Sequence, residues 1–337
     1  MDTTNLLNQL INKQDLTAEE ARLFLLEVMK RVITPSQIGA ILIALRMKGE
    51  TPEEIVGLIK AMRENMIRVN AKYAIDVCGT GGDSSGTFNI STAVAFVVAG
   101  AGVKVVKHGN RAASSKCGSA DVLEALGVNL QLSSQQAKEV FNQVGMVFLF
   151  APLFHPALKN LVTVRKELKT RTVFNLLGPF ANPASVKKQL IGVPSLEIAE
   201  KLAEVGKNLG YDHLLIVTSD DGFDEISVSS TSTLFEVKNK LIKKSVVNPA
   251  SYGFKKVSKK EIMGGSVEQN AGYIKEILQG RKGSKRDIVI LNSAAALYVD
   301  DVVVDIKEGI RLAEKSIDSG KAGLVLENLV KETQKYA

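Results

Sequence analysis

The feature that most constrains the fold is a regular alternation of short apolar runs with helical segments, which starts near Tyr73. The apolar runs predict strands at 74–77, 103–107, 146–150, 189–193 and 213–218. Helical spacing predicts helices between them at 90–101, 120–126, 135–144, 156–168 and 196–209. Because parallel strands need a crossover connection such as a helix, this order predicts an α/β fold with a parallel or mixed sheet.

The rest of the chain after this alternation is predicted to complete the same domain. Two runs, Thr233–Val237 and Leu241–Val247, lie on either side of Asn239 and predict a β-hairpin. Helical spacing of apolar residues then returns at 267–278, 288–299 and 306–319. We therefore expect a larger α/β domain over residues 71–337, with a central mixed sheet flanked by helices.

The first 65 residues are predicted to be entirely helical. Three capping boxes, in which Thr is followed three residues later by Glu or Gln, mark helix starts at Thr17, Thr34 and Thr51. Proline occupies the first helical position after two of them, at Pro35 and Pro52. Such short helices bury little surface alone. We expect a small helical domain over 1–70, joined by part of 160–185, that packs on the larger domain or on a second copy of itself.

Composition excludes several classes of protein. The chain has 337 residues, of which 45% are hydrophobic and 23% charged, as in soluble globular proteins. Two cysteines, Cys78 and Cys117, rule out a disulfide framework and a zinc site built from cysteines. The first residues do not combine a basic segment with an apolar stretch, which argues against a secretory signal. We expect a cytoplasmic protein with free thiols.

Positive charge is concentrated in one segment. The net charge is +7, and residues 237–260 hold eight lysines and no acidic residue. A solvated basic surface is the simplest interpretation. A nucleic-acid patch is the alternative, although only Tyr252 and Phe254 lie among these lysines to stack on bases.

The densest chemical signal follows the first predicted strand. The segment Asp76-Val-Cys-Gly-Thr-Gly-Gly-Asp83-Ser-Ser-Gly-Thr87-Phe-Asn-Ile-Ser91-Thr92 is a glycine-rich loop that leads into a helix. Glycines let backbone N–H groups approach an anion, and a helix N-terminus adds unpaired donors and a positive dipole end. The loop lacks the Gly-Lys-Ser/Thr of a Walker A motif and the third glycine of the dinucleotide fingerprint. It is therefore predicted to bind phosphate groups of another kind of ligand.

A second polar loop follows the next predicted strand. It reads Lys107-His-Gly-Asn-Arg111-Ala-Ala-Ser114-Ser115-Lys-Cys-Gly-Ser119 and combines cations, hydroxyls and glycines. Parallel strands place their carboxyl-end loops side by side, at the edge of the sheet where α/β proteins bind ligands. Two adjacent anion loops predict a ligand with two separated phosphate groups.

Acidic residues follow the strand predicted at 213–218, in Asp221-Gly-Phe-Asp224-Glu225. An exposed acidic turn would account for the pair Asp224 and Glu225 taken alone. Opposite two phosphate loops, the pair is better explained as an oxygen site for Mg²⁺. Arg165 and Arg171 follow His155-Pro156, and a partly buried arginine there could grip a carboxylate in bidentate fashion.

Taken together, these motifs resemble the anthranilate phosphoribosyltransferase family of tryptophan biosynthesis. The matching segments, found in order along the whole chain, are Gly79-Thr-Gly-Gly-Asp83, Thr87-Phe-Asn-Ile-Ser-Thr92, Lys107-His-Gly-Asn-Arg111 with Ser114-Ser115, Gly118-Ser-Ala-Asp-Val-Leu-Glu-Ala-Leu-Gly127, His155-Pro156, Arg165-Lys-Glu-Leu168, Arg171-Thr-Val-Phe-Asn-Leu-Leu-Gly-Pro179 and Asp224-Glu225. The resemblance implies Mg²⁺-dependent transfer of a phosphoribosyl group from 5-phosphoribosyl 1-diphosphate (PRPP) to the amine of anthranilate. It also implies a homodimer formed through the helical domain and hinge closure over the ligands.

The resemblance further implies a set of site residues. The positions that match the family's PRPP contacts are Gly79, Gly82, Asp83, Thr87, Asn89, Ile90, Ser91, Thr92, Lys107, His108, Gly109, Asn110, Arg111, Ala112, Ala113, Ser114, Ser115 and Ser119. Those that match the anthranilate contacts are Gly79, Asn110 and Arg165. Two Mg²⁺ ions would be held by Ser91, Asp224 and Glu225, and Lys107 would add electrostatic stabilisation. No general base is required, because an aniline-type amine is unprotonated at neutral pH.

Two alternatives remain open at this point. A pyrimidine or nucleoside phosphorylase of the same fold would use free phosphate and need no Mg²⁺; Ser91 and the Asp224–Glu225 pair argue against it. A non-enzymatic nucleic-acid-binding relative would use the lysines of 237–260, and the complete set of anion loops argues against it.

Overall fold

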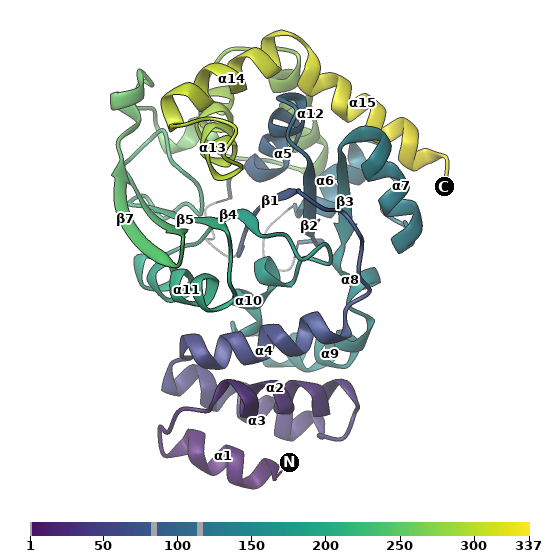
Figure 1. Cartoon of the computed structure of the whole chain (residues 1–337), viewed down its shortest axis with the longest axis vertical. Helices are drawn as coiled ribbons and strands as arrows, with labels where there is room; N and C mark the ends of the chain where they lie inside the picture. Colours follow the sequence, from purple (N-terminus) through teal and green to yellow (C-terminus); the bar gives the residue numbers. More distant parts are fainter. Residues whose placement is uncertain (1, 82–85, 113–116) are drawn as a thin grey trace.

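A seven-stranded mixed sheet forms the centre of the larger part of the protein (Figure 1). We analysed a computed structural model, which describes residues 2–81, 86–112 and 117–337. The strands, given in their order across the sheet, are β3 (Met146–Phe150), β2 (Val105–Gly109), β1 (Ile75–Gly79), β4 (Lys188–Gly192), β5 (His213–Ser219), β6 (Ser232–Lys238) and β7 (Leu241–Val247). The first five strands pair in parallel, and β6 and β7 pair antiparallel. The predicted mixed sheet and the predicted hairpin are both confirmed.

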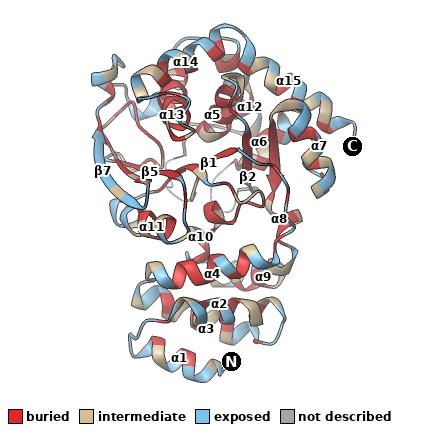
Figure 2. Ribbon diagram, viewed as in Figure 1, coloured by how far each residue is buried: buried red, intermediate tan, exposed pale blue. Residues whose placement is uncertain are grey.

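Alternating side chains in the middle of the sheet enter two different hydrophobic clusters. In β5, Leu215 and Val217 belong to one cluster, whereas Leu214 and Ile216 belong to the other. This period of two is what a sheet covered on both faces requires. Figure 2 shows buried residues along the strands and in the helices that cover them.

One face of the sheet is covered by helices from both halves of the chain. They are α5 (Ile90–Gly100), α6 (Ser119–Ala125), α7 (Ser134–Val144), α12 (Val267–Leu278), α13 (Ser284–Val299), α14 (Ile306–Asp318) and α15 (Lys321–Gln334). The other face is covered by α11 (Leu196–Asn208) and α10 (Phe174–Leu177). Below it lie the N-terminal helices, whose hydrophobic cluster continues into this face.

The N-terminal part is a bundle of α1 (Thr3–Ile11), α2 (Ala18–Met29), α3 (Pro35–Lys48) and α4 (Pro52–Asn65). All three predicted capping boxes are present, with Thr17, Thr34 and Thr51 as N-caps. Later helix α9 (Lys159–Leu168) lies against α2 and α3. The predicted fold class, a small helical domain and a larger α/β domain, is confirmed. The exact division at residue 70, with part of 160–185 joined to the first domain, stays a prediction.

Two segments differ from the sequence-based expectation. The predicted helix 156–168 begins as a 3₁₀ turn, Pro156–Leu158, and becomes α-helical only at Lys159. Helix α15, which begins at Lys321 after the N-cap Gly320, was not predicted. Short elements that periodicity also missed are α8 (Ala151–Phe154) and the 3₁₀ turns η2 (Gly178–Ala181), η3 (Pro249–Tyr252) and η4 (Lys259–Ile262).

Helices α2 and α4 cross at a glycine that cannot carry a side chain. A Cβ atom at Gly57 would lie 2.0 Å from the carbonyl oxygen of Ala18. We expect Gly57→Ala to lower stability by about 1–3 kcal/mol, because the overlap forces the helices apart and outweighs the better helix propensity of alanine. Thermal unfolding followed by circular dichroism measures this loss as a lower Tm.

Gly272 in α12 provides the matched control. A Cβ atom there would meet no atom within 4 Å. Gly272→Ala should therefore leave Tm unchanged or raise it, because alanine is up to about 1 kcal/mol more favourable than glycine inside a helix. Equal behaviour of the two variants would contradict the close crossing.

Candidate active site

The sequence motifs meet at the carboxyl edge of the parallel strands. From β1 the chain builds β2 and then β3 on one side, and later returns to place β4 on the other side of β1. A reversal of this kind opens a crevice at the carboxyl ends of the two strands. Gly79 ends β1 beside Gly192 at the end of β4, and β2 ends at Gly109.

Lys107 is a buried cation at this edge. Its side chain is 2% exposed, and its Nζ donates to the Val77 carbonyl oxygen at 2.6 Å and to Ser91 Oγ at 3.1 Å. Burial lowers the pKa of the Lys107 ammonium, and the negative charges of Asp76, Glu225 and Asp224 oppose that change. Lys107 therefore links the N-terminus of α5 with the acidic loop that follows β5.

The carboxylate pair of the acidic loop is fixed by close backbone packing. A Cβ atom at Gly79 would lie 2.2 Å from Asp224 Oδ2, and one at Gly192 would lie 1.5 Å from the Asp224 carbonyl oxygen. Only glycine at both strand ends leaves room for this loop. Glu225 is buried beside it, with 9% of its surface exposed.

Asn292 of α13 holds the same loop from behind, and sequence reasoning missed it. Its Oδ1 accepts from the Ile226 N–H at 2.8 Å, and its Nδ2 donates to the Ile226 carbonyl oxygen at 2.9 Å. A single asparagine in a helix carries no local signal of such a contact.

Asp221, at the start of the acidic loop, accepts hydrogen bonds from the hydroxyls of Ser219, Ser227 and Ser229. Burial tends to raise the pKa of Asp221, but these hydrogen bonds outweigh it and lower the pKa.

Asp76 lies beneath the edge as a fully buried carboxylate. It accepts from Asn182 Nδ2 at 2.9 Å, from Gln189 Nε2 at 3.1 Å and from the His108 N–H at 3.4 Å. Burial raises the pKa of Asp76 to about 6, and the charge of Lys107 opposes the rise. Asn182 and Gln189 are a further pair that the sequence did not reveal.

The glycine-rich loop ends at the N-terminus of α5, as predicted. Thr87 forms an isolated antiparallel bridge with Met263, and Ile90 begins the helix. Asn89 is its N-cap but makes no side-chain capping bond, and Asn89 Nδ2 donates instead to the Cys117 carbonyl oxygen at 3.1 Å. The Thr92 hydroxyl is fully buried and has no hydrogen-bond partner among the described residues. Gly82 and Asp83 lie outside the described residues.

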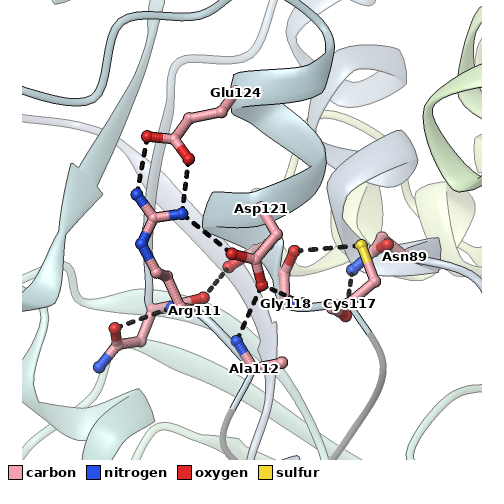
Figure 3. Close-up of polar contacts among 9 residues, drawn as sticks. Asn89, Arg111, Ala112, Cys117, Gly118, Asp121 and Glu124 are labelled. Carbon is pink, nitrogen blue, oxygen red and sulfur yellow. Dashed lines mark hydrogen bonds and ion pairs between the residues drawn. The ribbon is translucent and has the colours of Figure 1, made fainter. Parts of the chain in front are cut away.

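The second anion loop is organised around Arg111 (Figure 3). Its guanidinium forms a bidentate pair with Glu124, at 2.5 and 2.8 Å, and contacts Asp121 at 3.0 Å. Asp121 also accepts from the N–H groups of Ala112 and Gly118, so it holds the two ends of the loop together. The predicted cation is thus engaged by two carboxylates of α6, which the motif alone did not indicate.

Other residues of the second loop surround this pair. Asn110 is exposed, and its carbonyl oxygen accepts from Ser119 Oγ at 3.3 Å. Gly109 is tightly packed, since a Cβ there would lie 2.3 Å from Ser119 Oγ. Burial lowers the pKa of His108 to about 3, so its imidazole is neutral at physiological pH. Ala113, Ser114 and Ser115 lie outside the described residues.

Arg165 lies on α9, in the helical half of the protein. Its guanidinium stacks over the Phe174 ring at 5.7 Å, and burial lowers its pKa. Within the described part of the chain, no carboxylate pairs with it. His155, on the loop before α9, bonds through Nε2 to the Ala181 carbonyl oxygen at 2.9 Å, which gives it a structural role.

The arrangement suits stabilisation of an anion rather than proton transfer. A helix N-terminus, a buried ammonium and glycine-lined backbone offer positive potential, and two carboxylates with a hydroxyl offer oxygen ligands for a hard cation. Burial strengthens each of these interactions by excluding water.

Comparisons with known proteins agree with this geometry. Residues 4–66 match the glycosyl transferase family helical bundle domain, and residues 71–323 match the glycosyl transferase family a/b domain. The chain is 48% identical over 334 residues to an anthranilate phosphoribosyltransferase of Dehalococcoides mccartyi, covering 98% of both chains. It is 49% identical over 318 residues to one of a Thermoanaerobacter species, covering 94% of both.

Solved structures show the same likeness. A crystal structure of anthranilate phosphoribosyltransferase from Thermus thermophilus superposes with a TM-score of 0.92 at 38% identity, covering 99% of this chain and 100% of that one. The Saccharomyces cerevisiae enzyme in complex with PRPP and Mg has a TM-score of 0.91 at 27% identity, covering 99% of this chain and 98% of that one. The yeast enzyme in complex with 4-fluoroanthranilate gives 0.90 at 26% identity, with the same coverage.

The buried charges of Lys107 and Asp76 should be coupled in stability. We expect Lys107→Met to destabilise the fold by about 3–5 kcal/mol, because it leaves the Asp76 carboxylate buried without its nearest cation. Adding Asp76→Asn to this variant should recover part of the loss. The Tm of the double variant should therefore be higher than the sum of the two single-variant effects predicts. Additive effects would contradict the coupling.

The Lys107→Met defect should also depend on pH. The folded-state pKa of Asp76 is raised to about 6, so its protonation contributes stability at low pH that is lost as pH rises through that value. The difference in Tm between the variant and the unaltered chain should therefore narrow from pH 8 to pH 5.

Proposed function

This chain belongs to the family of anthranilate phosphoribosyltransferases and transfers the 5-phosphoribosyl group of PRPP to the amine of anthranilate; we propose that the carboxyl edge of β1, β2, β4 and β5 carries out this step of tryptophan biosynthesis. The observation that supports the site most directly is the contact of Lys107 with Ser91, next to the Asp224–Glu225 pair. It brings the glycine-rich loop, the second loop and the acidic loop to one place, as a doubly phosphorylated sugar requires.

The donor site is proposed to use both anion loops. Gly79, Thr87, Asn89, Ile90, Ser91 and Thr92, with Gly82 and Asp83, would hold the diphosphate and ribose through backbone N–H groups and the positive end of α5. Lys107, His108, Gly109, Asn110, Arg111, Ala112 and Ser119, with Ala113, Ser114 and Ser115, would surround the phosphoribosyl group. Arg111 donates three hydrogen bonds to Glu124 and Asp121, so its contact with the donor would use the other two of its five N–H groups.

Magnesium is proposed to bind at the acidic loop. Ser91, Asp224 and Glu225 supply the oxygen ligands that Mg²⁺ prefers, and the glycines that pack against Asp224 fix its position. When bound, Mg²⁺ supplies positive charge that neutralises the departing diphosphate. We propose two ions, since the diphosphate offers a second set of oxygens; calorimetry with Mg²⁺ and PRPP that finds a single ion would contradict this number.

Positioning and electrostatics would account for most of the rate enhancement. The bond from the anomeric carbon to diphosphate breaks while the anthranilate nitrogen approaches, and negative charge accumulates on the leaving group. Lys107 is preorganised beside that charge, so little reorganisation is needed during the reaction. The aromatic amine is already unprotonated, so holding it near the anomeric carbon lets the C–N bond form without prior removal of a proton. The nitrogen then loses one proton to the departing diphosphate or to water.

The acceptor site is proposed to involve Arg165, Gly79 and Asn110. Arg165 has its guanidinium over Phe174 and no carboxylate partner among the described residues, so it can receive the anthranilate carboxylate. Because Arg165 belongs to α9 and Gly79 to β1, the acceptor would lie between the helical half and the sheet. We propose that residues 1–70, with part of 160–185, move as one unit to close this space; equal scattering profiles with and without both substrates would contradict closure.

Assembly and location complete the proposal. Large apolar side chains are exposed on the N-terminal helices, among them Met47 and Ile11. We propose that these helices form a homodimer, which sedimentation showing only monomers would contradict. No helix in the described part of the chain is long and apolar enough to cross a membrane. Two free thiols, Cys78 and Cys117, fit the reducing cytoplasm, and cell fractionation tests that location.

One assay separates this function from its alternatives. Protein, Mg²⁺, PRPP and anthranilate are mixed, and the loss of anthranilate fluorescence is followed. Fluorescence should fall only when all four are present. Phosphorolysis of a nucleoside without metal would instead favour the phosphorylase. Tight DNA binding with a steep salt dependence and no turnover would favour the nucleic-acid binder.

Glu225→Gln should reduce Mg²⁺-dependent turnover by at least about 100-fold, the usual cost of losing one preorganised group that stabilises transition-state charge. Because the amide keeps the shape of the side chain, Tm should change little. Asp220→Asn is the control, since Asp220 is an exposed carboxylate on the same loop. Initial rates over a Mg²⁺ titration give the result, and full activity of Glu225→Gln would remove Glu225 from the metal site.

Arg165→Ala should raise the KM for anthranilate by roughly 10- to 150-fold, the worth of a hydrogen bond to a charged group. The KM for PRPP should stay nearly unchanged. Lys166→Ala is the control, because Lys166 is an exposed cation on the same helix. An effect confined to PRPP would show that the acceptor lies elsewhere.

A further inference from the structure

A buried asparagine of α12 connects the two anion loops. Asn270 is 2% exposed, and its Oδ1 accepts from the Gly265 N–H at 2.8 Å. Its Nδ2 donates to Asn89 Oδ1 at 3.1 Å. Asn89 Nδ2 in turn donates to the Cys117 carbonyl oxygen at 3.1 Å, in a contact that Figure 3 shows. The chain of bonds thus runs from α12 through the start of α5 to the end of the second loop.

The direction of this chain is fixed at both ends by the backbone. The Gly265 N–H can only donate, and the Cys117 carbonyl oxygen can only accept. Each amide between them must therefore present its oxygen toward Gly265 and its NH₂ group toward Cys117. Only a side chain with both an acceptor and a donor satisfies position 270, so a carboxylate of the same shape does not.

A second contact from the same segment supports the first loop. The Gly264 N–H donates to the Gly86 carbonyl oxygen at 2.8 Å, and Met263 forms the isolated antiparallel β-bridge with Thr87. A Cβ atom at Gly264 would lie 2.8 Å from the Thr87 carbonyl oxygen and 2.9 Å from Asn270 Oδ1. The segment before α12 is therefore packed directly against the backbone that leads into α5.

We propose that Asn270 is a positioning residue that sets the spacing of the two anion loops for PRPP, an inference that rests on the proposed function. Met263, Gly264 and Asn270 form a brace that is far from these loops in sequence and touches the flank of each. Asn270 does not contact the reacting atoms. Its effect on the reaction comes from holding Asn89 and the Cys117 backbone in register, so that both loops reach one ligand.

Asn270→Asp is the sharpest test, because it preserves shape and replaces the donor with a negatively charged acceptor that faces Asn89 Oδ1. We expect its KM for PRPP to rise by about 10- to 100-fold at pH 8, since a small misplacement of a binding group costs up to this factor. The Mg²⁺ concentration for half-maximal rate, measured at saturating PRPP, should stay unchanged. Lowering the pH should protonate the new carboxyl and restore a donor, so the KM for PRPP should fall toward that of the unaltered chain.

Asn292→Ala is the matched control. Asn292 is an equally buried asparagine on the neighbouring helix α13, but it holds the backbone beside Glu225. We expect it to raise the Mg²⁺ requirement. The proposal would be overturned if both variants lowered Tm but changed the KM for PRPP and the Mg²⁺ requirement in the same way. Asn270 would then have only a structural role.

Hydrogen exchange gives a readout that does not depend on turnover. In Asn270→Asp the amides of 86–92 and 117–120 should exchange faster, while those of β4 should not change. If the unaltered chain does not turn over PRPP, the proposed function fails. If it does, and the variant matches it in KM and in exchange, only the brace is wrong. Gly264→Ala, which presses on Thr87 without removing a bond, should raise the KM for PRPP as well, and an unchanged value would also contradict the brace.

Discussion

The buried ammonium of Lys107 is the interaction on which the site depends. The charges of Asp76, Glu225 and Asp224 counter the effect of burial on its pKa. The ammonium in turn lowers the pKa of Asp76, which also accepts hydrogen bonds from Asn182 and Gln189. The parallel order of the sheet creates this mutual dependence, because it brings the ends of β1, β2, β4 and β5 to one edge. The fold thus concentrates charge where a polyanionic donor would bind.

Close packing at glycines fixes the positions of the loops that carry these charges. Gly79 and Gly192 leave no space between the strand ends and Asp224, and Gly264 leaves none beside Thr87. Asparagines then hold the backbone of each loop from behind, Asn292 next to Glu225 and Asn270 next to Asn89. The loops proposed to bind the donor are supported by C-terminal helices that do not contribute motif residues themselves.

Much of the fold could be predicted because its signals are local. Capping boxes at Thr17, Thr34 and Thr51 placed three helices correctly, and alternation of apolar runs gave the strands and the mixed sheet. Helix α15 was missed, and its N-cap Gly320 offers no side-chain signal in the sequence. The 3₁₀ start at Pro156 leaves no mark in the periodicity. The candidate site followed from glycine, hydroxyl and charge patterns at the ends of strands. Its supports did not, because the contacts of Asn270 and Asn292 join residues far apart in the chain. The pairing of Arg111 with Glu124 was also hidden, since two charges in sequence do not specify which partner each one takes.

The hairpin at the far end of the sheet suggests an explanation of the basic segment that needs no ligand. Strand β7 is the outermost strand next to β6, and its backbone and the apolar side chains of Leu241 and Val246 face solvent. An uncovered strand of this kind invites pairing with the same strand of another molecule. Lys243 and Lys244 place positive charge along it, so that two such edges repel each other. The lysine-rich stretch would then protect the protein against aggregation at high concentration.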